Sequence, residues 1–279
     1  MCQVSVNAVE NTAIKGSGST VHYFQRVTLL VSLFAFVLLS AGCGQSFSET
    51  DQAKDSSVVQ LQEDVSAKQH TPVPIDTALY DQKNIQLANG DSSGLWPGKA
   101  PYPLPGAIFP FKRVVSYYGN LYSKRMGILG ELPPAEMLAK LKGEVKKWEA
   151  ADTATEVLPA LHYIAVTAQE SPGKGGKYRL RMPFHQIDSV LKMAEKIDAI
   201  TFVDVQVGLS TLQEEIPQLE KYLLMPDVHL GIDPEFSMKG GHRPGTVIGT
   251  FNADDINYVT GYLAELVKKN NLPPKILVI

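Results

Sequence analysis

The chain has 279 residues, of which 44% are hydrophobic and 20% are charged, so it is long enough to bury one sizeable core. A formal net charge of -3 offers no basic surface to neutralise several phosphates, which argues against a nucleic-acid partner. Only Cys2 and Cys43 occur, so we expect packing, and not a disulfide framework, to hold the folded part together.

An apolar segment near the amino terminus predicts a secretion signal. Residues 27–39 carry no charge and follow Arg26, and they are too few for a permanent membrane span of about 20 residues. The sequence Leu-Ser-Ala-Gly-Cys that ends at Cys43 resembles the lipobox of bacterial lipoproteins, although Ser40 stands where an aliphatic residue is usual. The resemblance implies that residues 1–43 are a signal peptide and that Cys43 is lipidated. The protein would then be anchored to a membrane of the cell envelope and face outside the cytoplasm; an uncleaved amino-terminal anchor is the alternative.

Residues 44–110 are expected to connect this anchor to the folded domain. Ser, Gln, Asp, Glu and Lys dominate as far as about Pro74, and such a composition cannot bury enough apolar surface to fold. Five prolines between Pro97 and Pro110 then indicate an extended approach to the core.

From residue 111 to residue 279, strand-like runs alternate with helical patterns. Strands are expected at residues 113–118, 157–166, 199–207, 228–236 and 275–279. Helices are expected between them, with apolar residues at helical spacing in 137–148, 187–197, 212–223 and 256–266. Ser210 is the expected cap of the third helix, Pro217 its expected kink, and Asn252 the start of the fourth.

This alternation predicts an α/β fold with a parallel sheet. We favour a (β/α) barrel-like domain over a doubly wound sheet because polar and aliphatic residues alternate along the strands. Val203, Val205 and Val207 would face helices, while Asp204 and Gln206 would point inward. A full barrel needs eight strands in roughly 250 residues, and about five are expected here. The buried-strand pattern of residues 275–279 therefore favours a truncated product, with a complete five-stranded open sheet as the alternative.

Polar residues end two neighbouring strands of the predicted sheet. Asp204 and Gln206 end the third strand, and Asp233 with Glu235 ends the fourth. Sites in parallel α/β folds lie at the carboxyl ends of strands about 4.8 Å apart, so these carboxylates could converge. Converging carboxylates repel, which raises one pKa and gives the pair of groups used in glycoside hydrolysis. Asp204, Asp233 and Glu235 are thus candidate catalytic residues; loop anchoring or cation binding is the alternative.

Several further residues are candidate substrate-binding groups. Tyr118 ends the first strand, His162 shares the inward face of the second, and Gln206 lies beside Asp204. Core packing explains the tyrosine equally well, and for the histidine it is the favoured interpretation. The loop of residues 237–246 carries Lys239, His242 and Arg243, which could bind an anionic substrate group or could simply be solvated.

Two classes of ligand have no motif in this sequence. The glycine-rich segment 172–177 lacks the spacing of a phosphate loop and the Ser or Thr after its lysine, so no nucleotide is expected there. CxxC, HExxH and paired-histidine motifs are absent, so we predict neither a built-in metal nor a cofactor.

The run Val-Ser-Tyr-Tyr-Gly-Asn at 115–120 and the run Asp-Pro-Glu-Phe-Ser-Met-Lys-Gly-Gly at 233–241 are similar to an uncharacterised group of bacterial lipoproteins and secreted proteins. The similarity covers roughly residues 111–279. It implies a TIM-barrel-like domain that would continue past Ile279, and it brings no established activity.

Two function hypotheses follow. The first is a membrane-tethered hydrolase that acts on polysaccharide. The second is a non-catalytic lipoprotein that binds a ligand such as carbohydrate or supports the envelope; an inactive fragment of a longer barrel protein is a further alternative.

Overall fold

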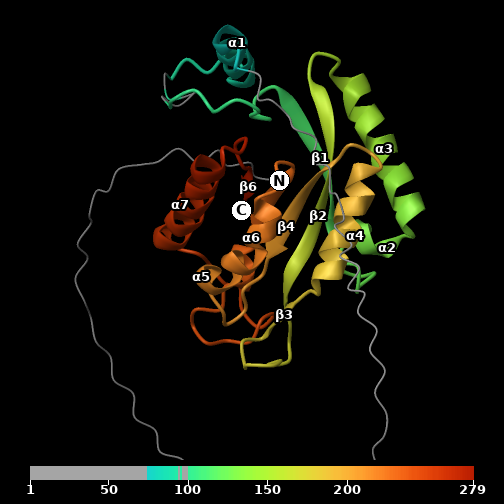
Figure 1. Cartoon of the computed structure of the whole chain (residues 1–279), viewed down its shortest axis with the longest axis vertical. Coiled ribbons are helices and arrows are strands. Elements are labelled where there is room, and N and C mark those ends of the chain that lie inside the picture. Colours follow the sequence, from blue (N-terminus) through green and yellow to red (C-terminus); the bar gives the residue numbers. More distant parts are fainter. Residues whose placement is uncertain (1–73, 94, 96–99) are drawn as a thin grey trace, which may run out of the picture. The chain divides into compact units, whose positions relative to one another are not determined.

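The computed structural model describes residues 74–93, 95 and 100–279, which belong to one compact unit. The predicted signal segment, Cys43 and the polar tether before Pro74 lie outside these residues. Helices and strands alternate along the described chain (Figure 1). In order they are α1 (Thr77–Leu87), β1 (Lys112–Gly119), α2 (Ile128–Glu131), α3 (Pro134–Ala151), β2 (Glu156–Ala168), β3 (Arg179–Arg181), α4 (Phe184–Glu195), β4 (Ile200–Val205), α5 (Leu212–Glu215), η1 (Ile216–Leu219), α6 (Glu220–Leu223), β5 (Val228–Ile232), η2 (Pro234–Phe236), α7 (Ala253–Asn270) and β6 (Leu277–Val278).

The sheet has the strand order β1-β2-β4-β5-β6, and neighbouring strands on this path are parallel. The five strands curl into a half-barrel, which confirms the predicted α/β, barrel-like class. The short β3 pairs antiparallel with the end of β2 and lies off the main path. It forms the hairpin at the lower end of Figure 1, where the parallel strands also end.

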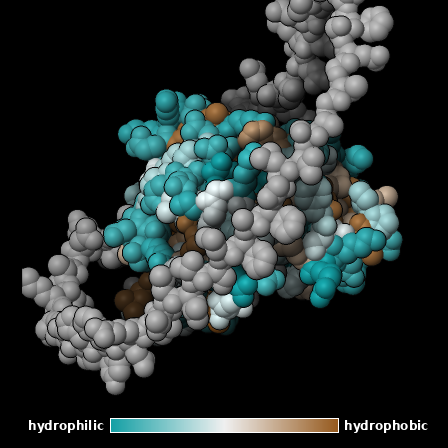
Figure 2. Space-filling model, turned by 90° about the horizontal axis from the view of Figure 1, so that it is seen from below, coloured by the Kyte–Doolittle hydropathy of each residue, from teal (hydrophilic) through white to brown (hydrophobic). Residues whose placement is uncertain are grey.

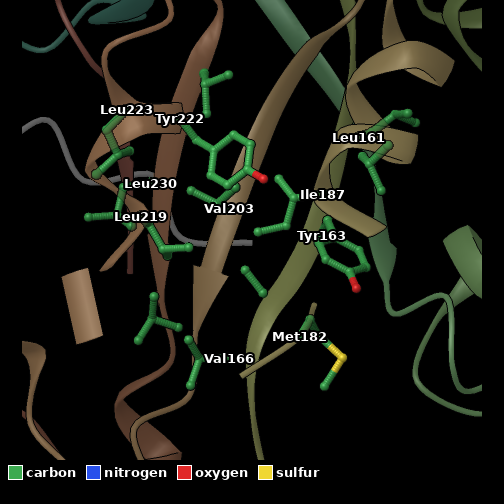
Figure 3. Close-up of a cluster of buried hydrophobic side chains, with 14 of the residues drawn as sticks. Leu161, Tyr163, Val166, Met182, Ile187, Val203, Leu219, Tyr222, Leu223 and Leu230 are labelled. Carbon is green, nitrogen blue, oxygen red and sulfur yellow. The ribbon is translucent and has the colours of Figure 1, made fainter. Parts of the chain in front are cut away.

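One face of the sheet packs against helices. Helix α3 contacts β1 and β2, α4 contacts β2 and β4, and α6 contacts β5. Figure 3 shows side chains from the strands and from the helices pointing toward one another in this layer; among those labelled are Leu161, Val203, Leu230, Ile187 and Leu223. Each such side chain contributes roughly 1.5–3 kcal/mol on burial.

The opposite face forms the inside of the half-barrel. Ala160, Ile200 and Phe202 are buried there and are covered in part by Ile108, which precedes β1. The predicted alternation of β4 is confirmed, because Val203 and Val205 pack on the helix side while Phe202 packs on the inner side.

Helices α3 and α7 follow their sequence signals. Pro134 opens α3, where its missing N–H needs no partner, and the helix buries Met137 and Leu141. Asn252 caps α7 through a capping box with Asp255, and Asn271 ends it in a left-handed conformation.

The region of the third predicted helix differs from expectation. Thr211, and not Ser210, is the cap, because its side chain accepts the N–H of Glu214. Pro217 cannot supply an N–H to the helical ladder, so the chain passes through the 3-10 turn η1 between α5 and α6 instead of continuing as one kinked helix. The Ser210 hydroxyl donates to the Glu215 carboxylate instead.

The ends of two strands also differ. The fourth predicted strand stops at Ile232, because Pro234 opens the 3-10 turn η2, and the last strand contains only Leu277 and Val278. No element was predicted where β3 and α1 lie. Within the described part of the chain, no helix combines the length and the apolar character that a membrane span requires.

Candidate functional site

Three side chains meet at the carboxyl ends of β1, β4 and β5. The Tyr118 hydroxyl donates to Asp233 Oδ2 at 2.8 Å and lies 3.3 Å from Asp204 Oδ2. One phenol proton therefore serves two carboxylates. The geometry shows the predicted convergence of Asp204 and Asp233. Tyr118 joins them from β1, which is two places from β4 and three places from β5 in the sheet.

Gln206 ties the group to the backbone. Its Nε2 donates to Tyr118 Oη at 3.1 Å and to Asp233 Oδ2 at 2.8 Å, and its Oε1 accepts the N–H of Ala168 at 3.0 Å. Both ends of this amide are thus used, which fixes its orientation. Because Gln206 follows β4 directly, the loop after the strand cannot move without breaking these bonds.

His162 supports Asp204 from the neighbouring strand. Its Nε2 lies 3.0 Å from Asp204 Oδ1, and both side chains are almost completely buried. Gly231 makes room for this pair, because a Cβ there would come within 2.2 Å of Asp204 Oδ1 and 2.4 Å of His162 Nε2. A glycine at this position of β5 is therefore required by the site.

The rings of Tyr118 and His162 belong to a row of four rings that crosses the sheet. The centroids of Tyr118 and His162 are 5.0 Å apart, those of His162 and Phe202 5.1 Å, and those of Phe202 and His229 5.4 Å. The four residues occupy one register level across β1, β2, β4 and β5. The packing of these four rings against one another holds the hydrogen-bonding atoms of Tyr118 and His162 in place.

Burial and the charge of Asp204 raise the pKa of the Asp233 carboxyl to about 7. The hydrogen bonds from Gln206 and Tyr118 lower it, but by less. Burial and the two carboxylates also raise the pKa of the Tyr118 phenol, which therefore remains a proton donor. A carboxyl group that titrates near neutrality is suited to give up and take back a proton.

The two aspartates differ in access. Asp204 has no exposed surface, whereas Asp233 is part-exposed. Asp233 is thus the group that an outside molecule could reach. The buried Asp204 affects Asp233 through its charge, which raises the pKa of Asp233.

The other predicted site residues do not join this network. Glu235 is exposed. It lines a separate cavity beside the network, together with Phe236 and residues 245–248. Lys239 pairs with Asp255 at the start of α7, and Arg243 reaches Glu170 at 3.4 Å. His242 is exposed in the same loop.

Sequence reasoning missed the supporting residues. Phe202 and His229 look like ordinary strand residues in the sequence, and His229 lies near the start of its strand, away from the carboxyl end where a site is expected. It is buried, and its Nδ1 accepts the N–H of Ile276 at 3.0 Å. Gly231 carried a usable signal, since it interrupts an apolar strand at the level of Asp204.

Among the described residues, no cluster of three or more His, Cys, Asp or Glu side chains is arranged to hold a metal ion. The mutual hydrogen bonding of Asp204, Asp233, Tyr118 and Gln206 already uses the oxygens that face one another. Comparison with protein-family models, curated proteins and solved structures finds no match to this chain.

Proposed function

We propose that this protein hydrolyses glycosidic bonds of a polysaccharide outside the cytoplasm, with Asp233 as the proton donor. The observation that carries the proposal is the pairing of a part-exposed carboxyl group of pKa about 7 with a buried carboxylate next to it. Two carboxyl groups in different environments are the usual equipment for breaking this bond.

The roles of the two aspartates follow from their access and charge. Protonated Asp233 would give its proton to the oxygen of the departing sugar as the glycosidic bond breaks. The negative charge of Asp204 would stabilise the positive charge that develops on the anomeric carbon. Water then adds to that carbon, and its proton returns to Asp233.

Tyr118, Gln206 and His162 would act as positioning residues. Tyr118 and Gln206 both donate to Asp233 Oδ2, which leaves Oδ1 free of contacts with them. His162 holds Asp204 in its orientation. Tyr118 and Gln206 therefore fix which oxygen of Asp233 faces a substrate, and His162 fixes the neighbouring Asp204.

The activity test uses the full chain and a panel of polysaccharides, with release of reducing ends as the measurement. We expect Asp233→Asn to abolish hydrolysis and Asp204→Asn to slow it at least about tenfold. Asp198→Asn, a change at an exposed aspartate whose φ of 50° suits asparagine, is the matched control and should leave the rate unchanged. Hydrolysis at the wild-type rate by Asp233→Asn would exclude the proposal.

Carbohydrate binding without turnover is a second candidate. The observation in its favour is that the polar groups of the site satisfy one another, as they do in a structural network. Binding of an oligosaccharide that wild-type protein never cleaves would select this candidate.

The location outside the cytoplasm rests on the lipobox-like residues 39–43. We propose that Cys43 is lipidated and anchors the domain to a membrane. Labelling of cells with a radioactive fatty acid should mark the wild-type chain and not a Cys43→Ala variant. Equal labelling of both would refute the anchor.

A further inference from the structure

A cavity of about 310 Å³ lies beside the site and takes no part in the hydrogen-bonded network. Glu235 and Phe236 form one wall, directly after Asp233 in the chain, and residues 245–248 form the other. The charge of Glu235 contributes to the raised pKa of Asp233, which places this wall close to the proton donor. The volume is at the lower end of the range for small-molecule sites.

The walls of this cavity are held rigidly. Gly249 N–H donates to the carbonyl of Glu235 at 2.8 Å, and Gly208 N–H donates to the carbonyl of Phe236 at 3.0 Å. A Cβ on Gly249 would lie 2.3 Å from the carbonyl oxygen of Ser237, so the two wall segments are in direct backbone contact. The backbones of the two walls are therefore joined before any ligand arrives, which lowers the entropic cost of ordering them on binding.

The lining combines three apolar side chains with the Glu235 carboxylate and the Thr246 hydroxyl, which donates to the carbonyl of Arg243 at 2.7 Å. Val247 is 43% exposed and Ile248 is 88% exposed, and both line the cavity together with Phe236. The Glu235 side chain makes no hydrogen bond or ion pair with any residue in the described ranges. The coloured part of the face seen in Figure 2 is largely hydrophilic, with a few hydrophobic patches.

We infer that this cavity is a substrate subsite for the acetamido group of an N-acetylated sugar, an inference that rests on the proposed polysaccharide activity. The methyl group would pack on Val247, Ile248 and the Phe236 ring. The amide N–H would donate to the Glu235 carboxylate. An unsubstituted sugar carries a hydroxyl at that position and would leave the apolar wall exposed to water, so the site selects N-acetylated glycans.

The test measures binding to the full-length Asp233→Asn chain, so that turnover plays no part. Calorimetry compares two pentasaccharides with the same β-1,4 linkage, one of N-acetylglucosamine and one of glucose. We expect the N-acetylated pentamer to bind about tenfold more tightly or better. Adding Val247→Ser and Ile248→Ser should remove this preference, whereas Leu180→Ser, which changes an exposed leucine outside the cavity, should leave it intact.

The carboxylate is tested by two substitutions. Glu235→Gln keeps an acceptor oxygen and should retain most of the preference, while Glu235→Ala should lose it. Equal affinity for the two pentamers, or a preference that survives Val247→Ser with Ile248→Ser, would overturn the inference.

Wild-type chain incubated with the same pentamers separates the two proposals. Selective binding of the N-acetylated pentamer without cleavage would support the subsite and refute the hydrolase. Cleavage of glucose polymers without a preference for the N-acetylated ligand would support the hydrolase and refute the subsite.

Discussion

Asp233 links stability to pH at the scale of a single residue. Its folded-state pKa of about 7 exceeds the ordinary 3.8, so the native protein holds a proton that the unfolded chain has released between these values. Stability therefore falls as the pH rises from about 4 to about 7. Asp233→Asn removes this loss and should be more stable than wild type at pH 8 by an amount on the order of 1 kcal/mol, with a smaller gain at pH 4.5. Urea unfolding at both pH values measures the difference, and an equal loss of stability at both would contradict the assignment.

Gly231 is the second residue on which the site depends. Alanine there would press a Cβ against Asp204 and His162, so Gly231→Ala should lower the free energy of unfolding by about 1–3 kcal/mol. Gly143, inside α3, has no atom within 4 Å of an added Cβ. Gly143→Ala should therefore raise stability by roughly 0.5–1 kcal/mol. Thermal and urea unfolding of both variants should show changes in stability of opposite sign. If Gly231→Ala were as stable as wild type, the site would not require a glycine at this position.

At the scale of elements, a buried carboxylate attaches β3 to α5. Glu215 has no exposed surface and accepts hydrogen bonds from Arg179 at 2.7 Å and Arg181 at 2.6 Å. Burial opposes its ionisation, but the hydrogen bonds from Arg181, Ser210 and Arg179 prevail and hold its pKa below the ordinary 4.5. The stabilisation is therefore present above about pH 4.5 and is lost as the pH falls below that value.

Removing this charge tests the attachment. Glu215→Gln should lower stability by about 3 kcal/mol at pH 7 and should speed hydrogen exchange in β3 and the end of β2. The difference in the free energy of unfolding between Glu215→Gln and wild type should become smaller in acid. Glu214→Gln, at the half-exposed neighbour, is the control and should change stability by less than about 1 kcal/mol. Exchange in β3 that stays slow in Glu215→Gln would contradict this role.

The elements also show what could be predicted from the sequence. Helices α3, α4 and α7 were expected because each has a long apolar stripe, and Asn252 also marks the start of α7. Strand β3 has three residues, too few for a period, and its position depends on the distant Glu215. Pro217 was recognised as a disturbance, but whether a proline kinks a helix or ends it is decided by tertiary packing.

The candidate site was predictable to a similar extent. Asp204 and Asp233 follow adjacent parallel strands, so their meeting follows from the topology. Tyr118 spans the distance from β1, and that reach depends on the curl of the sheet, which the sequence does not encode locally. Glu235 turns away because β5 ends at Ile232 and Glu235 lies in the 3-10 turn that Pro234 opens.

At the scale of the whole domain, one hydrogen-bonded group joins strands from both halves of the described sheet. Tyr118 comes from β1, His162 from β2, Asp204 from β4, and Asp233 follows β5. The half-barrel thus brings together residues that are 115 positions apart in the chain. Proton binding at Asp233 should consequently respond to changes made on other strands.

The most direct measurement is a carbon-13 NMR titration of the Asp233 carboxyl in wild type, Asp204→Asn and Tyr118→Phe. The site as described predicts a pKa of about 7 in wild type. It predicts a lower pKa in Asp204→Asn, which removes a like charge, and a higher one in Tyr118→Phe, which removes a donor to the carboxylate. Titration of Asp233 near 3.8 in all three proteins would contradict the coupled site and, with it, the role of Asp233 as a proton donor at neutral pH.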